Sequence, residues 1–325
     1  MVKYSFIIPT KEINDYIYEA IPIILEINRD DYEIIIYPDK ATATAWPKTK
    51  QIASGRSGPA FKRNLAAKDA SGEILIFIDD DAYPKNNFLE ILAADFKDEN
   101  IKAVGGPALT PANDGFWQKV SGAVFLSALA GGKPERYRPI GDKKKVDDWP
   151  SVNFSIRKSV FMELGGFDSK FWPGEDTKLC LDLIKKYPQS IIYDPRLIAY
   201  HHRRPVLGQH LKQVGGYGLH RGFFAKKYPQ TSFKLIYFLP SCFLVFVVAG
   251  GLLSFFSNLA LELYLTGWLL YFLALIKAFF DIRRQEKSFL VIVNAIYYIF
   301  LTHLVYGFNF IKGFVFTKYL QSQLR

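Results

Sequence analysis

The stretch Ala70-Ser-Gly-Glu-Ile-Leu-Ile-Phe-Ile-Asp79-Asp-Asp81 decides the fold of the first part of the chain. Residues 74–78 are all apolar and do not alternate with polar ones, which is typical of a strand buried on both faces of a sheet. Three carboxylates follow directly, at the end of the strand where open α/β sheets bind their ligands. The stretch therefore predicts an α/β domain whose ligand site begins just after residue 78.

Strand and helix patterns alternate on both sides of this stretch. Strands are expected at residues 4–8, 33–37, 74–78, 101–104, 152–156, 190–193 and 197–201, and helices at about 15–27, 59–70, 87–96, from 157 and at 175–187. This alternation predicts a mostly parallel central sheet with helices on both faces. An unusually apolar helical stretch is expected at 116–129, and a polar, Lys-rich loop at 131–150.

The net charge of +10 on these 325 residues is not spread evenly. Residues 1–200 carry a net charge of −1, whereas residues 201–234 hold seven basic and no acidic side chains, and residues 235–325 add +4. A nucleic-acid-binding domain would show its basic residues on the body, so nucleic acid is excluded as a partner. We expect the basic segment 201–234 to lie beside a membrane and to bind anionic lipid headgroups.

Three long apolar stretches follow the basic segment. Residues 235–256 and 289–311 are uncharged, and residues 259–280 carry only Glu262 and Lys277. About 20 apolar residues suffice for a helix to cross a bilayer, although a single such stretch can also be a buried core helix. Three in succession predict an α-helical membrane domain of about three spans over residues 235–325.

The basic residues also predict an orientation. No signal-peptide pattern precedes the first expected strand, so residues 1–230 are expected to form a cytosolic domain of a multi-pass cell-membrane protein. Arg283 and Lys287, between the second and third stretches, favour the cytosolic side as well. Three spans would then place Lys312 and Lys318 outside, against the same rule. A tilted or re-entrant third segment would remove this conflict.

Two acidic groups are candidates for chemistry. Asp79, Asp80 and Asp81 would repel one another without a cation, and their oxygens suit a divalent ion such as Mg²⁺ or Mn²⁺. A solvated acidic turn is the alternative. Glu175 and Asp176 begin a predicted helix, where they either cap the helix or include a general base for an acceptor hydroxyl.

Basic side chains in two places suit phosphate groups. Arg63, near the start of a predicted helix, either offers its guanidinium to a diphosphate or is an ordinary surface arginine. In the basic segment, Arg203, Arg204 and Arg221 either anchor the chain to lipid or also grip a diphosphate or a lipid-phosphate acceptor.

The ordered set of motifs resembles a known family. Ser5-Phe-Ile-Ile-Pro-Thr10, Gly58…Arg63-Asn64, the 70–81 stretch, Asn153-Phe-Ser-Ile-Arg157, Gly165-Gly-Phe-Asp168 and Gly174-Glu-Asp176 occur in the order and spacing of family 2 glycosyltransferases with the GT-A fold. The resemblance covers about residues 3–225. It implies an inverting transfer from a nucleotide-diphospho-sugar.

The resemblance also implies roles for single residues. Asp79 and Asp81 match the metal-binding Asp-x-Asp motif, and His201, with His202 as the alternate, matches a third metal ligand. Asp176 matches the catalytic base, with Glu175 beside it. The remaining expected contacts are Thr10 and Asp39 to the base, Asp80 to the nucleotide, Arg63 to the diphosphate, and Asn153, Arg203, Arg204 and Arg221 to the diphosphate or the acceptor.

The sequence therefore predicts a membrane-anchored, metal-dependent glycosyltransferase acting on a lipid-linked or saccharide acceptor in cell-surface glycan or polysaccharide biosynthesis. The Gln-x-x-Arg-Trp motif of processive synthases is missing, which disfavours a polymer-extruding enzyme. One alternative is a polyprenyl-phosphate glycosyltransferase. The other is a non-catalytic membrane protein that binds a nucleotide-sugar.

Overall fold

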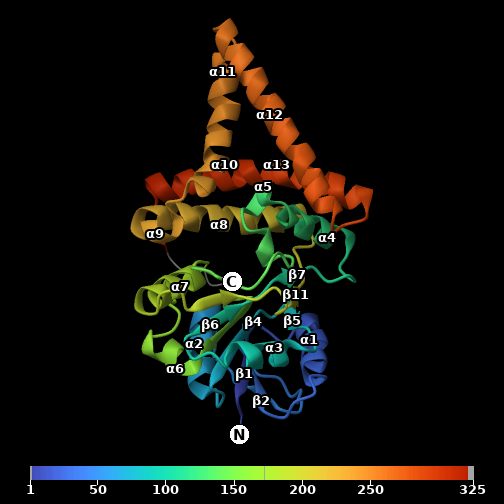
Figure 1. Ribbon diagram of the computed structural model, residues 1–325, viewed down its shortest axis with the longest axis vertical. Helices are drawn as coiled ribbons and strands as arrows, with labels where there is room; N and C mark the ends of the chain where they lie inside the picture. The colour runs from blue at the N-terminus through green and yellow to red at the C-terminus, as the bar shows by residue number, and fades with distance from the viewer. Residues whose placement is uncertain (1, 172, 321–325) are drawn as a thin grey trace. The chain divides into compact units, whose positions relative to one another are not determined.

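The computed structural model describes residues 2–171 and 173–320, which divide into two compact units. Unit 1 contains residues 2–111 and 138–202, and unit 2 contains Ala112–Tyr137 and Arg203–Leu320. Figure 1 labels the elements of both. Residues 203–230 thus belong to the same compact unit as the apolar helices, whereas the sequence predicts a domain boundary at residue 230, just before the first apolar stretch.

Unit 1 is built on a mixed, mostly parallel sheet. Its strands are β1 (Tyr4–Pro9), β2 (Tyr32–Tyr37), β3 (Thr49–Gln51), β4 (Ile74–Ile78), β6 (Ala103–Gly105), β8 (Lys144–Lys145), β9 (Asn153–Arg157) and β10 (Ile191–Tyr193). They lie in the order β3-β2-β1-β4-β9-β6-β10-β8. β9 pairs antiparallel with both β4 and β6, and β8 pairs antiparallel with β10. The predicted α/β class is confirmed.

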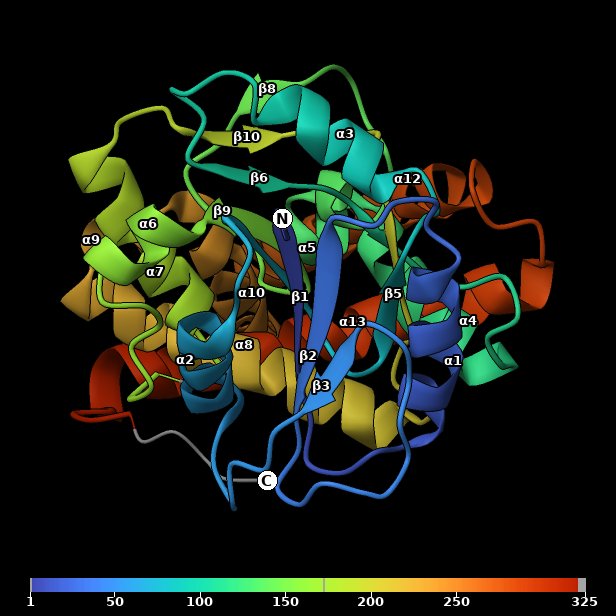
Figure 2. The same ribbon diagram turned by 90° about the horizontal axis from the view of Figure 1, so that it is seen from below.

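Helices cover both faces of this sheet. α1 (Asp15–Leu25) and α3 (Phe88–Asp95) lie on one face, and α2 (Pro59–Asp69), α6 (Lys158–Glu163) and α7 (Glu175–Lys186) on the other (Figure 2). β4 shows why its apolar run has no alternation. Ile74, Ile76 and Ile78 belong to the core under α1 and α3, and Leu75 and Phe77 to the core under the other helices.

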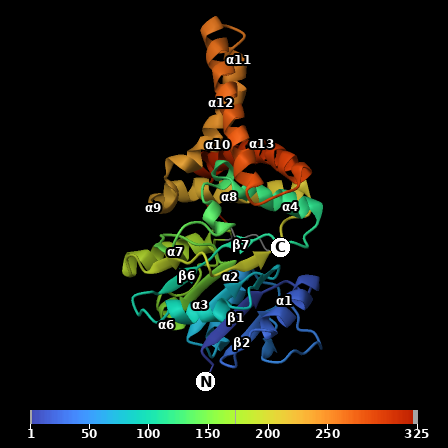
Figure 3. The same ribbon diagram turned by 45° about the vertical axis from the view of Figure 1, so that its right-hand side comes forward.

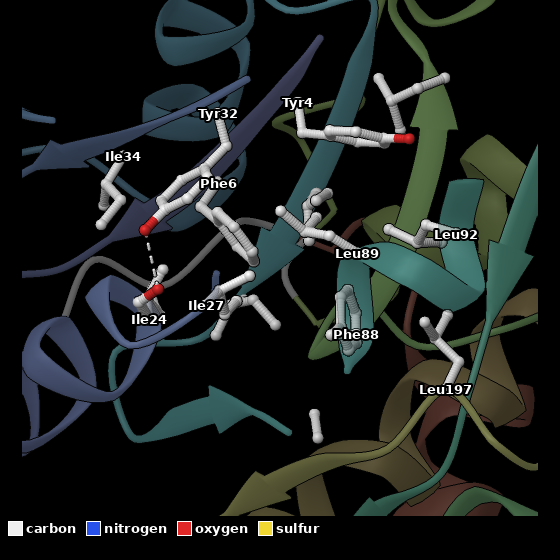
Figure 4. Packing of buried hydrophobic residues seen from close by; sticks show 14 of the residues in the cluster. Tyr4, Phe6, Ile24, Ile27, Tyr32, Ile34, Phe88, Leu89, Leu92 and Leu197 are labelled. Carbon is white, nitrogen blue, oxygen red and sulfur yellow. Dashed lines mark hydrogen bonds between the residues drawn. The ribbon is translucent and has the colours of Figure 1, made fainter. Parts of the chain in front are cut away.

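The core under α1 and α3 is shown in Figure 4. Phe6 of β1 packs between Tyr32 of β2 and Phe88 of α3, with ring centroids 5.9 and 6.3 Å apart. The Tyr32 hydroxyl donates a hydrogen bond of 3.0 Å to the carbonyl of Ile24 at the end of α1. This bond satisfies a buried polar group and fixes α1 against the sheet.

A small second sheet lies at the carboxyl end of β4. It has the order β5-β11-β7, with β5 (Ala82–Pro84), β7 (Ala108–Leu109) and β11 (Ala199–His201). β11 pairs antiparallel with β5 in a register that sets His201 opposite Ala82. A histidine more than a hundred residues away in sequence is thereby placed next to the carboxylates that follow β4.

The Lys-rich stretch 131–150 is more than the polar loop that its composition predicts. It contributes the short strand β8 to the sheet, and Trp149 is buried to 1% exposure. The Trp149 indole donates a hydrogen bond of 3.0 Å to the carbonyl of Gly106. The stretch therefore helps to close unit 1.

Unit 2 is helical. It comprises α4 (Phe116–Ala123), α5 (Ala128–Gly131), α8 (Leu207–Lys227), α9 (Pro229–Ser232), α10 (Leu235–Val245), α11 (Gly251–Leu253), α12 (Asn258–Arg283) and α13 (Phe289–Ile311). A π-helical turn, Phe246–Gly250, joins α10 to α11 into one helix. Within the described residues, three segments are long and apolar enough to cross a membrane: Leu235–Leu253, Asn258–Arg283 and Phe289–Phe316.

The segment 207–227 is helical despite its many glycines, because these glycines allow α8 to pack closely on α13. α8 packs side by side with α13 (Figure 1), and a Cβ on Gly218 or Gly222 would come within 2.5 or 2.1 Å of α13 backbone carbonyls. Gly313, just after α13, is equally close to the backbone of α8. Such close backbone approach through small residues is typical of helix packing in membrane proteins. Tertiary contact thus overrides the low helix propensity of glycine.

This packing predicts the effect of a single added methyl group. Gly222→Ala should destabilise the protein by about 1–3 kcal/mol, since its Cβ would overlap the Phe310 carbonyl oxygen. Gly208→Ala on the same helix is the matched control, because nothing lies within 4 Å of its Cβ. Thermal unfolding in detergent should show a lower midpoint for the first variant and not for the second. Equal midpoints would contradict the close packing of α8 on α13.

Candidate active site

Three predicted ligands meet at the carboxyl end of β4. Asp79, Asp81 and His201 each offer one ligand atom, and these atoms lie within 4.8 Å of one another. The His201 Nε2 atom is 3.0 Å from Asp81 Oδ1. The pairing of β11 with β5 produces this proximity, and it joins residues from two distant parts of the sequence.

His202 points elsewhere. Its ring stacks on Tyr16 at 4.5 Å, and its Nε2 atom lies 3.0 Å from a carboxylate oxygen of Glu19. Successive side chains of a strand point to opposite faces, so only one of the two histidines can face the carboxylates. Of the two candidates, His201 is the one that lies beside Asp79 and Asp81.

The chemistry of this cluster suits a divalent cation. Two carboxylate oxygens and an imidazole nitrogen form a mixed donor set of the kind that divalent first-row metals accept. Asp81 and His201 are buried, whereas the side chain of Asp79 is 30% exposed. Ligands from solvent or substrate can therefore complete the coordination on the open side.

Arg63 joins this cluster to the start of α7. Its Nη2 atom donates to Asp79 Oδ1 at 2.5 Å, and its Nη1 atom donates to Glu175 Oε1 at 2.9 Å. Arg63 is 3% exposed, so it is not an ordinary surface arginine. Burial alone would lower the pKa of its guanidinium, but Asp79, Glu175 and Asp176 outweigh burial and raise that pKa. These three carboxylates thus share one electrostatic neighbourhood.

A small support structure holds Arg63 in place. Its neighbour Asn64 donates from Nδ2 to the Phe167 carbonyl at 2.8 Å and accepts from the Phe167 N–H at 2.8 Å. Gly166, with φ of 75°, passes so close that a Cβ would lie 2.6 Å from Asn64 Oδ1. The Arg63 guanidinium lies over the Phe167 ring at 5.6 Å. The Gly-Gly-Phe-Asp motif is therefore a support for α2.

The two acidic residues at the start of α7 have different surroundings. Gly174 adopts φ of 116°, a conformation that favours glycine, and the helix begins directly after it. Burial raises the pKa of Glu175, and the neighbouring Asp176 raises it further, while Arg63 opposes both. Asp176 is only half-buried, and its oxygens accept from the N–H groups of Thr177 at 2.7 Å and Ser151 at 3.3 Å.

The residues expected around the nucleotide also lie together. The Thr10 hydroxyl is 2.8 Å from Asp80 Oδ2, and the Asn14 amide donates to the same oxygen at 3.5 Å. Lys62, which is 2% exposed, forms an ion pair with Asp39 and donates to the Thr10 carbonyl. Sequence reasoning did not identify Lys62. Its only signal is its place in α2 directly before Arg63, since nothing local distinguishes it from a surface lysine.

For the other expected contact residues, the structure shows different partners. Asn153 is fully buried in β9, where its Nδ2 atom donates to the carbonyls of Pro107 and Leu197 at 3.1 and 2.8 Å. Arg203, Arg204 and Arg221 belong to unit 2. There Arg203 lies over the Tyr137 ring at 5.2 Å, and Arg221 lies over the Tyr237 ring at 4.9 Å. Their contacts to a diphosphate or an acceptor stay predictions.

Comparison with known proteins identifies the domain. Residues 5–165 match the model of glycosyl transferase family 2. The chain carries a family 2 glycosyltransferase domain. The match contains Thr10, Arg63 and the Asp79–Asp81 carboxylates, while His201 and the start of α7 lie beyond it.

Relatives of this chain differ in how much of it they share. The pre-mycofactocin glycosyltransferase of Mycobacterium tuberculosis is 27% identical over 179 residues, which are 55% of this chain and 37% of that protein. The chain thus matches little more than a third of that relative. A dolichyl N-acetyl-alpha-D-glucosaminyl phosphate 3-beta-D-2,3-diacetamido-2,3-dideoxy-beta-D-glucuronosyltransferase of Methanococcus voltae is 22% identical, over 96% of this chain and 97% of its own.

A solved structure shares the fold. The mannosyltransferase PcManGT of Pyrobaculum calidifontis, determined in complex with GDP-Man and Mn²⁺, aligns with a TM-score of 0.62 over 96% of this chain and 87% of its own. The sequence identity is 17%. The predicted GT-A fold class, with apolar helices at the C-terminal end, is thereby confirmed.

Arg63 offers a direct test of this arrangement. Arg63→Met should destabilise the protein by about 3–5 kcal/mol, because it leaves Glu175 as a buried carboxylate without its cation. Adding Glu175→Gln should recover part of that loss, so that the double variant is more stable than the sum of the single effects predicts. Thermal unfolding measures all three variants.

The control for this cycle is Arg56→Met. Arg56 is exposed on the loop before α2, and its replacement should leave the unfolding midpoint unchanged. Strict additivity of Arg63→Met and Glu175→Gln would contradict the ion pair.

Proposed function

We propose that the protein is an inverting glycosyltransferase that moves a sugar from a nucleotide-diphospho-sugar to a lipid-linked acceptor, using Mg²⁺ or Mn²⁺. One observation carries this proposal. The Asp79, Asp81 and His201 ligand atoms lie within 4.8 Å of one another, and Arg63 connects Asp79 to the acidic pair that begins α7. One guanidinium thus connects a candidate cation site to Glu175, the neighbour of the candidate base Asp176.

The donor side of the reaction follows from the residues around Asp79. Asp79, Asp81 and His201 would hold the ion, which when bound neutralises the negative charge that develops on the leaving nucleoside diphosphate. Arg63 fixes the Asp79 carboxylate through its hydrogen bond. The connected group of Thr10, Asp80, Lys62 and Asp39 would receive the nucleoside, and the ion pair with the buried Lys62 holds the Asp39 carboxylate in place.

Asp176 is the residue of the acidic pair that suits a general base. It is half-buried, so an acceptor hydroxyl can reach it, and two backbone N–H groups orient its carboxylate. Glu175 is buried and engaged by Arg63. Asp176 would take the proton of the acceptor hydroxyl while the hydroxyl oxygen bonds to the anomeric carbon. The bond to the diphosphate breaks on the opposite side, which inverts the anomeric centre.

Two features support a lipid-linked acceptor at a membrane. Three apolar helices follow the glycosyltransferase domain, each long enough to cross a bilayer. The relative from Methanococcus voltae, whose name specifies a dolichyl-linked sugar phosphate, aligns along nearly the whole chain, the apolar helices included. The charge distribution favours a cytosolic catalytic domain.

The metal role has a binding test. Calorimetry should show that GDP or UDP binds the purified protein with Mn²⁺ or Mg²⁺ present and at least tenfold more weakly after chelation, because an ion held by Asp79, Asp81 and His201 would supply positive charge for the phosphates. Asp81→Ala should show the weak binding even with metal, whereas Asp142→Ala, at an exposed site, should bind like the wild type. Binding that neither chelator nor Asp81→Ala changes would exclude this role.

The base assignment has a turnover test. Asp176→Asn should lower the rate of glycosyl transfer by about 10²–10⁴-fold and leave metal-dependent nucleotide binding unchanged, since only proton removal is lost. Asp182→Asn, on the same helix and paired with Lys178, is the matched control. The acceptors offered are polyprenyl phosphate, a polyprenyl-phosphate-linked sugar and a free saccharide.

Each result of this assay has a defined meaning. Near wild-type turnover of Asp176→Asn would reject the base. Transfer to bare polyprenyl phosphate alone would replace the proposed acceptor by the alternative one. Nucleotide-sugar binding without transfer to any acceptor would favour the non-catalytic class.

A further inference from the structure

The three apolar helices differ in how they are packed. Of the most apolar 18 residues in each, none is buried in α12, 6% are buried in the α10–α11 helix, and 39% are buried in α13. A helix surrounded by lipid needs few protein contacts. The third helix therefore has an environment that the other two lack, although all three satisfy the same length criterion.

Besides its contacts with α10, α13 packs against two helices, α8 and α4, that are not candidate membrane spans. α8 accompanies its second half, from the His210 ring, 3.0 Å from the Thr302 hydroxyl, to Lys226, which donates to the Thr317 carbonyl at 2.8 Å. α4 accompanies the first half, where Trp117 stacks on Tyr298 with ring centroids 6.2 Å apart. Figure 3 shows α13 beside α8 and α4, away from the free end of the α11–α12 hairpin.

The charges of α8 fix the depth of both helices. The part of α8 that packs beside α13 carries four basic side chains: Lys212, Arg221, Lys226 and Lys227. A lysine or arginine at the centre of a membrane-spanning helix costs about 2.5–3.5 kcal/mol each on translocon scales. α8 therefore cannot lie in the hydrocarbon core. α13 is in contact with it over at least four turns and must lie at the same level.

The α10–α11 helix and α12 pack against each other and extend away from α13. Phe243 of α10 stacks on Tyr271 of α12 at 4.2 Å, and α13 meets the pair at this level. There Ser241 donates to the Gly307 carbonyl at 3.1 Å, and the Tyr271 hydroxyl is 2.9 Å from the His303 ring. Beyond this level α10, α11 and α12 form a hairpin that ends at Ser257 (Figure 1).

The length of this hairpin matches one bilayer. From Phe243 to Ser257 it rises about 21 Å, and the uncharged part of α12 between Glu262 and Lys277 is also about 21 Å long. A helix lying in the interface is immersed by about 5–10 Å. Together these give about 26–31 Å, close to the hydrocarbon thickness of about 30 Å. Glu262, one turn from the tip, then reaches the far headgroups.

We propose that the chain crosses the bilayer twice, through the α10–α12 hairpin, and that α13 rests in the interface with its free face on lipid. That face consists of exposed apolar side chains: Phe289, Leu290, Val293, Tyr297, Phe308, Val315 and Phe316. Tyr297 and the exposed Trp117 suit the aromatic belt of a membrane–water interface. The partner of this surface is a lipid bilayer, and the assignment does not depend on the catalytic proposal.

Two crossings also resolve the charge conflict in the sequence. An even number of spans returns Lys312 and Lys318 to the side of the basic helix α8. All basic residues of the tail then obey the positive-inside rule together with Arg283 and Lys287. Three crossings would violate that rule at the end of the chain.

Labelling with a membrane-impermeant maleimide tests the number of crossings. Single cysteines replace the exposed residues Asn258, Lys287 and Lys318 in full-length protein with Cys180→Ser and Cys242→Ser, reconstituted in sealed vesicles. Lys212→Cys marks the side of α8. We expect Lys287→Cys and Lys318→Cys to label from that side and Asn258→Cys from the other. Labelling of Lys318→Cys and Asn258→Cys from one common side would overturn the proposal. It would also be overturned if the maleimide labelled Asn258→Cys from neither side.

A depth measurement tests the position of α13 without relying on any one variant. Nitroxide labels at Val293, Tyr297 and Phe308 should all report the same immersion depth by the ratio of oxygen to nickel-chelate accessibility. A spanning helix would instead separate the first and last labels by about 22 Å, because 15 residues rise 1.5 Å each. Equal depths near the headgroup boundary support the interfacial helix, and a graded series of depths refutes it.

Discussion

The buried guanidinium of Arg63 is the interaction on which the catalytic unit depends. It lies between Asp79, which follows β4, and Glu175, which begins α7, and so it connects two elements that are 96 residues apart in the sequence. Removing charges from water is costly unless they are paired. Asp79 also belongs to the group with Asp81 and His201 whose ligand atoms lie within 4.8 Å of one another, so Arg63 links this candidate cation site to the start of α7.

Much of unit 1 could be predicted because its signals are local. The apolar run of β4 followed by carboxylates, and Gly58-Pro59 at the start of α2, specify elements without reference to the rest of the chain. The antiparallel insertion of β9 between β4 and β6 could not be predicted, because a five-residue strand does not encode its neighbours. The same holds for Trp149, which the polar composition of its surroundings concealed.

In the candidate site, too, residues with a local sequence signal can be predicted, whereas residues placed by tertiary contacts cannot. The sequence alone predicts roles for three aspartates: Asp79, Asp81 and Asp176. The choice of His201 over His202, by contrast, requires the register of β11 against β5. The sequence does not single out Lys62, and it shows Asn64 only as part of a motif without a role, because the roles of both are contacts with distant backbone and side chains. A residue that supports another carries no pattern of its own.

The hydropathy of residues 235–325 does not by itself give the number of membrane spans. Apolar side chains there either face lipid or pack against other helices. In α12 they face outward, where lipid is the natural partner, but in α13 one face packs on α8 and α4 and the other is exposed. Length and composition cannot separate these cases, because apolar side chains favour any non-aqueous surroundings, whether lipid or protein. The two cases are distinguished by whether the helix packs against a charged helix, as α13 does against α8. A helix held by close glycine contacts to a lysine-bearing partner shares the depth of that partner, whatever its own hydropathy predicts.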